Sequence, residues 1–146
     1  MIWFEDIEIG KETEYGSYEV TREEVLEFAR KYDPQPFHLS DEAAAKTHFG
    51  RIAASGWHTA GITMSLLVKS GMPISGGLIG AGGEIEWPRP VRPGDVLQVE
   101  SEVLAVVPSR SRPERGMITV KSVTKNQRGE VVQTLTSKML VWKKGS

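Results

Sequence analysis

The spacing of apolar residues predicts an amphipathic helix in the first quarter of the chain. Four apolar residues occupy positions i, i+3, i+4 and i+7 of one helical face: Val25, Phe28, Ala29 and Tyr32. Thr21, followed three positions later by Glu24, forms a capping box, so the helix should begin there. Because a residue that precedes proline avoids the helical region, the helix should end at about Asp33.

Two further helices are expected before residue 72. Ser40 precedes two acidic residues and suits the N-cap of a short helix in "SDEAAAKTHFG". A longer helix should begin near Ser55 or Gly56 and close near Gly71. Apolar residues cover nearly every side of it: Trp57, Ala60, Ile62, Met64, Leu66, Leu67 and Val68. A helix that is apolar all round is expected to be buried.

The apolar period changes to two in the second half of the chain, which predicts strands. The candidate strands are 83–91, 95–107, 116–125 and 130–142. One face of the second should carry Leu97, Val99, Val103, Ala105 and Val107. The segment "NQRG", with Gly129, suits a tight hairpin, and "SRSRPERG" suits a longer one. Strands gathered after helices indicate an α+β fold, with an antiparallel sheet around a central helix, in a single domain over residues 1–146.

Composition narrows the classes of function. The 146 residues contain no cysteine, which excludes disulfides and thiolate nucleophiles. With 18 basic and 19 acidic residues, the net charge of −1 does not favour nucleic acid or an anionic membrane as a partner. No apolar run reaches the roughly 20 residues that span a bilayer. The N-terminus lacks the basic and apolar regions of a signal peptide. We expect a soluble cytoplasmic protein.

The stretch "YDPQPFHLS" holds an acid and a base close together in the chain. Pro34 and Pro36 have fixed φ angles and should make a stiff, non-helical corner between Asp33 and His38. Asp33 would lie at the negative end of a helix, where burial and the dipole should raise the pKa of its carboxyl group. His38 could serve as the matching base. Alternatively, Asp33 starts a turn and His38 is an ordinary loop histidine.

A second candidate is "AASGWHT", at the start of the long helix. The first N–H groups of a helix have no intrahelical acceptor, so Gly56 could donate to a carbonyl oxygen on which negative charge develops. The structural alternative is that Ser55 is only an N-cap and that Gly56 only permits close packing.

Other clusters point less clearly to a site. His38, His48 and His58 lie ten residues apart, which is not the close spacing of zinc ligands, so no metal is expected. Several basic residues could bind phosphates or simply be solvated: Lys69, Arg89, Arg92, Arg110, Arg112 and Arg115. The glycines of "GGLIGAGGEIEW" do not match a phosphate-binding loop and should let the sheet bend around the helix.

Three segments in this order resemble the MaoC-like dehydratases, relatives of the (R)-specific enoyl-CoA hydratases: "YDPQPFHLS", "FGRIAASGWHTAGITMSLLV" and "EWPRPVRPGD". The resemblance covers about residues 15–142. It implies a hot-dog fold that usually pairs into a dimer, a catalytic aspartate and histidine at Asp33 and His38, and an oxyanion-hole amide at Gly56. Many relatives carry asparagine where Gln35 stands, and histidine where Ser55 stands, so substrate choice could differ.

The expected reaction is reversible addition of water to a trans-2-enoyl-CoA, or another enoyl thioester, giving a (3R)-hydroxyacyl thioester. His38 would take a proton from water, Asp33 would deliver one to C2, and Gly56 N–H would bind the carbonyl oxygen. The expected substrate contacts are Gln35, Phe37, Ser55, Trp57 and Arg89, with Ile62 also near the acyl chain. No cofactor is expected, because coenzyme A enters with the substrate. The alternatives are a hot-dog acyl-CoA thioesterase and a non-catalytic acyl-thioester binding module.

Overall fold

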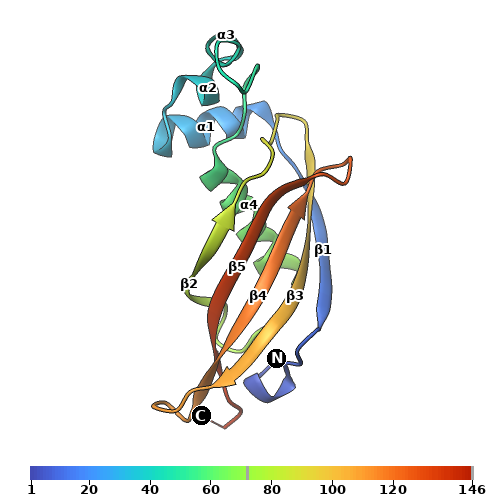
Figure 1. Cartoon of the computed structure of the whole chain (residues 1–146), viewed down its shortest axis with the longest axis vertical. Coiled ribbons are helices and arrows are strands. Elements are labelled where there is room, and N and C mark those ends of the chain that lie inside the picture. Colours follow the sequence, from blue (N-terminus) through green and yellow to red (C-terminus); the bar gives the residue numbers. More distant parts are fainter. Residues whose placement is uncertain (72, 146) are drawn as a thin grey trace.

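A long helix, α4 (Gly56–Ser70), lies against a curved five-stranded antiparallel sheet (Figure 1). The computed structural model describes residues 1–71 and 73–145. The strands are β1 (Glu12–Glu19), β2 (Ile79–Glu86), β3 (Val96–Pro108), β4 (Arg115–Lys125) and β5 (Val131–Trp142). Their order across the sheet is β1-β3-β4-β5-β2, so β1 and β2 are its edges. This confirms the α+β class and the antiparallel sheet around a central helix.

Three helices gather at one end of the sheet, and both termini lie at the other end (Figure 1). They are α1 (Arg22–Tyr32), α2 (Pro36–Leu39) and α3 (Asp41–Ala44), and a short 3-10 helix, η1 (Phe4–Asp6), lies near the N-terminus. The capping box of α1 is confirmed, since the Thr21 hydroxyl accepts the Glu24 N–H at 3.3 Å. Ser40 caps α3 as predicted, accepting the Ala43 N–H at 3.2 Å.

Two helical expectations are wrong. The proline corner is not wholly non-helical, because Pro36 opens α2 at the first helical position, where its missing N–H costs nothing. Helix α4 is not buried all round. Trp57, Met64 and Val68 leave 60%, 44% and 64% of their surface exposed, and their spacing places them on one face of the helix.

The sheet differs from the predicted strands in three places. Strand β1 was not predicted, because this mostly polar edge strand buries only Tyr15. Strand β2 begins earlier than expected and ends at Glu86, before the Trp87–Pro88 dipeptide. In β3, the register against β4 shifts by one residue between Val103 and Ala105. Past that bulge the faces exchange, so Val107 is exposed while Val106 packs inward.

The main core fills the space between α4 and the sheet, with contributions from Ile62, Leu66, Leu97, Val99 and Val132. A buried polar network crosses it. The Gln133 amide nitrogen donates to the Thr63 hydroxyl at 3.0 Å, and that hydroxyl lies 2.7 Å from the hydroxyl of Thr124. Gln133 also accepts the indole N–H of Trp87 at 3.0 Å. The network therefore ties the segment after β2 to the middle of the sheet.

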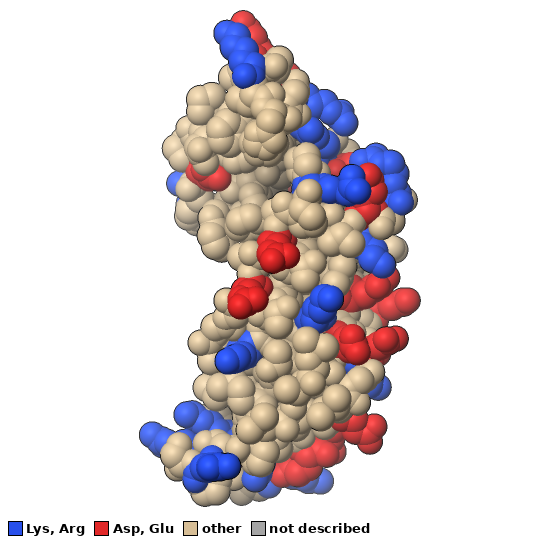
Figure 2. Space-filling view, in the orientation of Figure 1, with Lys and Arg blue, Asp and Glu red and all other residues tan. Residues whose placement is uncertain are grey.

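No helix among the described residues is long and apolar enough to cross a membrane. Acidic side chains gather along the flank formed by β1 and β3, on the right in Figure 2. They include Glu12, Glu14, Glu100 and Glu102, which lie opposite one another across the two strands.

Candidate functional site

The carboxylate of Asp33 lies at the C-terminal end of α1, where it accepts hydrogen bonds from two side chains. Asp33 is the C-cap of α1, and its backbone N–H donates to the Ala29 carbonyl at 2.9 Å. The Gln35 amide donates to Oδ1 at 2.6 Å, and the Ser55 hydroxyl donates to Oδ2 at 2.7 Å. These bonds fix the orientation of the carboxylate from both sides.

The imidazole of His38 is buried beside this carboxylate and has a defined tautomer. His38 lies on α2 and is 5% exposed. Its Nδ1 is 2.6 Å from the Ala53 carbonyl oxygen, which can only accept, so Nδ1 carries a proton. The other nitrogen, Nε2, lies 3.3 Å from Asp33 Oδ2. The sequence therefore correctly predicted that Asp33 and His38 lie together, and Nε2 faces the carboxylate.

The pKa of Asp33 contradicts the expectation of a raised value. Partial burial does raise it, but the hydrogen bonds from Gln35 and Ser55 and the neighbouring His38 together outweigh burial. The pKa of Asp33 consequently lies below the ordinary value of 3.8, and the group is an ionised carboxylate at neutral pH. These donors come from outside α1, which is why the helix-end argument alone predicted the wrong direction.

The start of α4 presents an unpaired amide next to this pair. Ser55 is the N-cap of α4, and its hydroxyl accepts the Trp57 N–H at 3.3 Å while donating to Asp33. The amide of Gly56, the first residue of α4, makes no hydrogen bond within the described part of the chain. The preceding strand-like segment is held on both sides, because Ala53 N–H donates to Phe37 and Ala54 N–H donates to Val91.

A pocket of about 550 Å³ is lined by both His38 and Gly56, whereas Asp33 contacts His38 from outside the pocket lining. Its lining is mainly apolar and comprises Gln35, Phe37, His38, His48, Phe49, Ala54, Gly56, Thr59, Trp87, Pro88, Arg89, Pro90, Val91 and Val132. The indole of Trp87 covers Gly56 so closely that a β-carbon there would lie 2.6 Å from the ring. Glycine at position 56 is thus required by this close approach.

Three of the predicted substrate contacts line the pocket, namely Gln35, Phe37 and Arg89. Ser55 acts on Asp33 instead. Trp57 does not line the pocket. Its ring is exposed and meets the Trp87 ring edge-on, with 5.1 Å between centroids.

Ile62 also lies outside the pocket, buried in the core. Trp87 could not be identified from the sequence, because its contact with Gly56 depends on how β2 pairs with β5. The signal that could have indicated it is an aromatic residue beside two prolines in "WPRP".

Of the other sequence clusters, His48 and Arg89 line the pocket, whereas His58 and the loop with Arg110 and Arg112 do not. Among the described residues, no three of His, Cys, Asp and Glu lie close enough to hold a metal ion. His58 stacks on Phe28, with 4.9 Å between ring centroids. The loop with Arg110 and Arg112 precedes β4, at the end of the sheet opposite to helices α1 to α3 (Figure 1).

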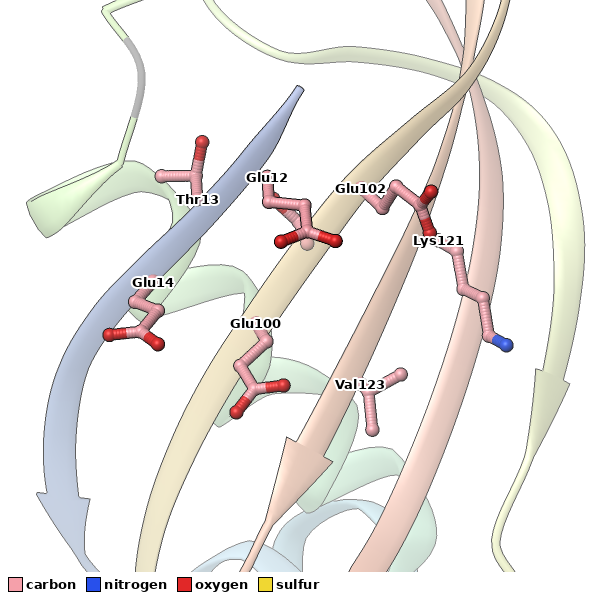
Figure 3. A pocket seen from close by; sticks show the side chains of 8 residues that line it. Glu12, Thr13, Glu14, Glu100, Glu102, Lys121 and Val123 are labelled. Carbon is pink, nitrogen blue, oxygen red and sulfur yellow. The ribbon is translucent and has the colours of Figure 1, made fainter. Parts of the chain in front are cut away.

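A second hollow, of about 410 Å³, lies on the outer face of the sheet. Figure 3 shows four glutamates there, Glu12, Glu14, Glu100 and Glu102, with Lys121 beside them. The hollow shares no residue with the pocket at His38. Its four carboxylates would repel an anionic ligand.

Comparison with known proteins agrees with this geometry. Residues 6–127 match the family model described as MaoC like domain. A MaoC-like dehydratase from Rhodospirillum rubrum is 51% identical, with full coverage of both chains and a TM-score of 0.96. An R-hydratase from Pseudomonas aeruginosa is 26% identical, covering 98% of this chain and 87% of that one, with a TM-score of 0.75.

A curated relative gives the same assignment at the level of sequence. The 3-hydroxybutyryl-CoA dehydratase of Methylorubrum extorquens is 36% identical over 114 residues, which is 77% of this chain and 70% of the relative. Together with the helix-and-sheet architecture, these matches establish the hot-dog fold. The chain belongs to the MaoC-like dehydratase family.

Proposed function

We propose that this protein is a hydro-lyase that adds water reversibly to a trans-2-enoyl-CoA to give a (3R)-hydroxyacyl thioester. The observation that carries the proposal is the 3.3 Å approach of His38 Nε2 to the Asp33 carboxylate, beside a pocket that His38 and Gly56 both line. The names of two relatives support it, since one is a 3-hydroxybutyryl-CoA dehydratase and the other an R-hydratase.

The Gly56 amide would act on the thioester carbonyl. In an enoyl thioester, attack at C3 moves electron density through C2 onto the carbonyl oxygen. A hydrogen bond from Gly56 N–H, at the positive end of α4, stabilises that negative charge. The thioester carbonyl is thus the electron sink, and the reaction needs no cofactor beyond the coenzyme A that enters with the substrate.

His38 would carry out both proton transfers. Because Nδ1 donates to Ala53, the free lone pair is on Nε2, which can take a proton from water as its oxygen attacks C3. The resulting imidazolium faces the ionised Asp33 and is stabilised by it. The same proton then passes to C2, so one water molecule is consumed and His38 is restored. Transfer from one face gives syn addition.

In this scheme Asp33 does not deliver the proton to C2, although this was expected from the sequence. An ionised carboxylate with a lowered pKa is a poor proton donor, so it would position the water and stabilise the imidazolium. Gln35 and Ser55 would hold the carboxylate in place, while Phe37 and Arg89 would contact the substrate. Trp87 would close the pocket above the Gly56 amide.

The test is hydration of crotonyl-CoA, followed by the loss of its conjugated absorbance. We expect His38→Ala and Asp33→Ala each to lower kcat by about 10²- to 10⁴-fold while both variants remain folded. Glu27→Ala, which removes an exposed carboxylate from α1, is the matched control and should keep full activity. Activity that survives both site substitutions would contradict the proposal.

The same reactions distinguish the two alternatives. A thioesterase would release free coenzyme A, which a thiol-reactive dye detects, whereas hydration leaves the thioester intact. A non-catalytic binding module would bind crotonyl-CoA without consuming it. Loss of absorbance without release of thiol therefore identifies the hydratase.

We further propose that the protein forms a homodimer. The exposed apolar face of α4 and the unpaired backbone of edge strand β2 are adjacent features that a second copy could cover. The pocket is next to this surface, since Trp87 follows β2 directly and meets Trp57 on α4.

A further inference from the structure

A basic groove lies beside the proposed catalytic pocket, at the end of the sheet near α1 to α3. Its volume is about 230 Å³, and it is lined by Arg51, Arg89, Arg92, Arg128, Asn126 and Glu130, with Pro90 between the arginines. Four guanidinium groups and one carboxylate give this small surface a formal charge of +3, although the whole chain carries −1. The groove is therefore a local concentration of positive charge that the net charge of the chain does not indicate.

Internal contacts hold three of the four guanidinium groups in place, those of Arg89, Arg92 and Arg128. Arg92 donates to the backbone carbonyls of Arg51 and Phe49, each at 2.6 Å, which anchors it to the loop before α4. Glu130 accepts from Arg128 Nε at 2.7 Å and pairs with Arg89 Nη1 at 3.2 Å. Each contact uses one or two of the five N–H groups of a guanidinium, so the others remain to bind a ligand.

The groove and the catalytic pocket share a wall. Arg89 and Pro90 line both, so the groove is the immediate neighbour of the pocket. Guanidinium forks match the oxygens of phosphate groups in geometry and in charge. In coenzyme A thioesters, the neutral acyl end and the anionic phosphate end are joined by one flexible arm, which corresponds to an apolar pocket beside a basic groove.

We propose that the four-arginine groove binds the phosphate groups of the coenzyme A nucleotide, so that the substrate is a free acyl-CoA. This inference rests on the function proposed above. A folded carrier protein is the competing source of the same pantetheine arm. Its docking would require a face of about 800 Å², whereas the groove is a concavity of about 230 Å³, the scale of a small anion.

The acidic flank along β1 and β3 makes the charge distribution asymmetric (Figures 2 and 3). Glu12, Glu14, Glu100 and Glu102 would repel the nucleotide from that side. The acidic flank and the basic groove together should direct an anionic substrate toward Arg89 and away from the outer face of the sheet.

The direct test uses adenosine 3′,5′-bisphosphate, which carries the 3′-phosphate and one 5′-phosphate of coenzyme A but no thioester. Isothermal titration should show binding to the wild-type protein, weakened by about 10- to 100-fold in Arg51→Ala/Arg128→Ala. Arg110→Ala, in the loop at the opposite end of the sheet, is the control and should bind as wild type. Binding that is unchanged in the double variant, or absent in the wild type, overturns the proposal.

The kinetic test compares three substrates: crotonyl-CoA, its 3′-dephospho analogue and crotonyl-pantetheine. The double variant should raise KM for crotonyl-CoA by about 10-fold or more with little change in kcat, and should not alter kcat/KM for crotonyl-pantetheine. A smaller effect with the dephospho analogue assigns part of the groove to the 3′-phosphate. A carrier-protein thioester that is preferred to crotonyl-CoA, with the same arginine dependence, overturns the proposal.

The two experiments separate the groove from the reaction. If the nucleotide binds in an arginine-dependent manner but no enoyl thioester is hydrated, the proposed function fails and the phosphate site stands. If crotonyl-CoA is hydrated but the arginine substitutions change neither binding nor KM, the reaction stands and the phosphate site fails.

Discussion

Because the Trp87 ring lies against Gly56, no side chain larger than the hydrogen atom of glycine fits at position 56. The indole cannot easily move away, because its N–H is bonded to Gln133 and its ring edge meets Trp57. Gln133 is fully buried and is itself held by Thr63. The amide proposed to bind the substrate is therefore positioned by a chain of contacts that reaches strand β5.

We expect Gly56→Ala to lower the free energy of unfolding by about 1–3 kcal/mol, as overpacked sites do, and to reduce hydratase activity by displacing the amide. Glu27→Ala, at an exposed position of α1, is the control and should change the free energy of unfolding by less than about 0.5 kcal/mol. Denaturant unfolding measures both changes.

A double-mutant cycle assigns the effect to the indole. Combined with Trp87→Ala, the cost of Gly56→Ala should largely disappear, because the clashing ring is gone. If the penalty is the same with and without the indole, the contact is not its cause.

At the scale of elements, α1 packs on α4 through an aromatic pair that contains a titratable ring. His58 stacks on Phe28 and is 8% exposed, and its Nδ1 has no hydrogen-bond partner among the described residues. Burial lowers the pKa of His58 below its ordinary value of 6.5, and the nearby Glu24 offsets this only in part. The α1–α4 contact therefore requires a neutral imidazole.

This requirement makes stability depend on pH in a definite direction. Below pH 6.5 the unfolded chain binds a proton at His58 that the folded protein does not bind until a lower pH. The free energy of unfolding should thus be fully retained above pH 6.5 and should fall as the pH drops toward the lowered pKa.

His58→Phe should remove that part of the pH dependence and, by eliminating an unpaired buried nitrogen, add on the order of 1 kcal/mol. His48→Gln is the control, since His48 is exposed and should leave the wild-type dependence intact. Urea unfolding between pH 5 and 8 makes the comparison. Equal slopes for wild type and His58→Phe would show that another group is responsible.

At this scale, features that depend on residues close in the chain could be predicted from the sequence, whereas features that depend on pairing between distant segments could not. The α1 cap, the α4 boundaries and the proximity of Asp33 to His38 depend on residues close in the chain, and they were predicted correctly. The β3 bulge that exposes Val107 depends on pairing between strands. So does the position of β1, whose polar sequence carries no clear alternation. The predicted direction of the Asp33 pKa was wrong because it left out the hydrogen bonds from Gln35 and from Ser55, which reaches Asp33 from 22 residues away.

For the whole molecule, the notable feature is that a single chain leaves an apolar face of α4 exposed to solvent. Apolar residues at positions 57, 64 and 68 follow one helical face, and edge strand β2 ends next to the pocket. A second copy covering this face would bury these residues and the β2 edge together.

We expect analytical ultracentrifugation to give twice the 16.1 kDa chain mass for the wild type and the single chain mass for Val68→Glu. A charge on the α4 face cannot be buried against an apolar partner without a large cost. Val107→Glu is the control, because Val107 is exposed at the far end of β3 and should leave the dimer intact. A wild-type protein that sediments as a monomer would exclude the dimer.

The hydroxyl of Ser55 connects the carboxylate of Asp33 to the backbone amide of Trp57. This hydroxyl receives the Trp57 amide hydrogen and gives its own hydrogen to Asp33, so the three groups form a one-way relay of hydrogen bonds. The relay keeps this direction while the carboxylate is an acceptor. Protonation of Asp33 would free the hydroxyl to rotate and would loosen the amide at its other end. The Trp57 amide is therefore a built-in spectroscopic reporter of the charge on Asp33, readable by NMR without a substrate.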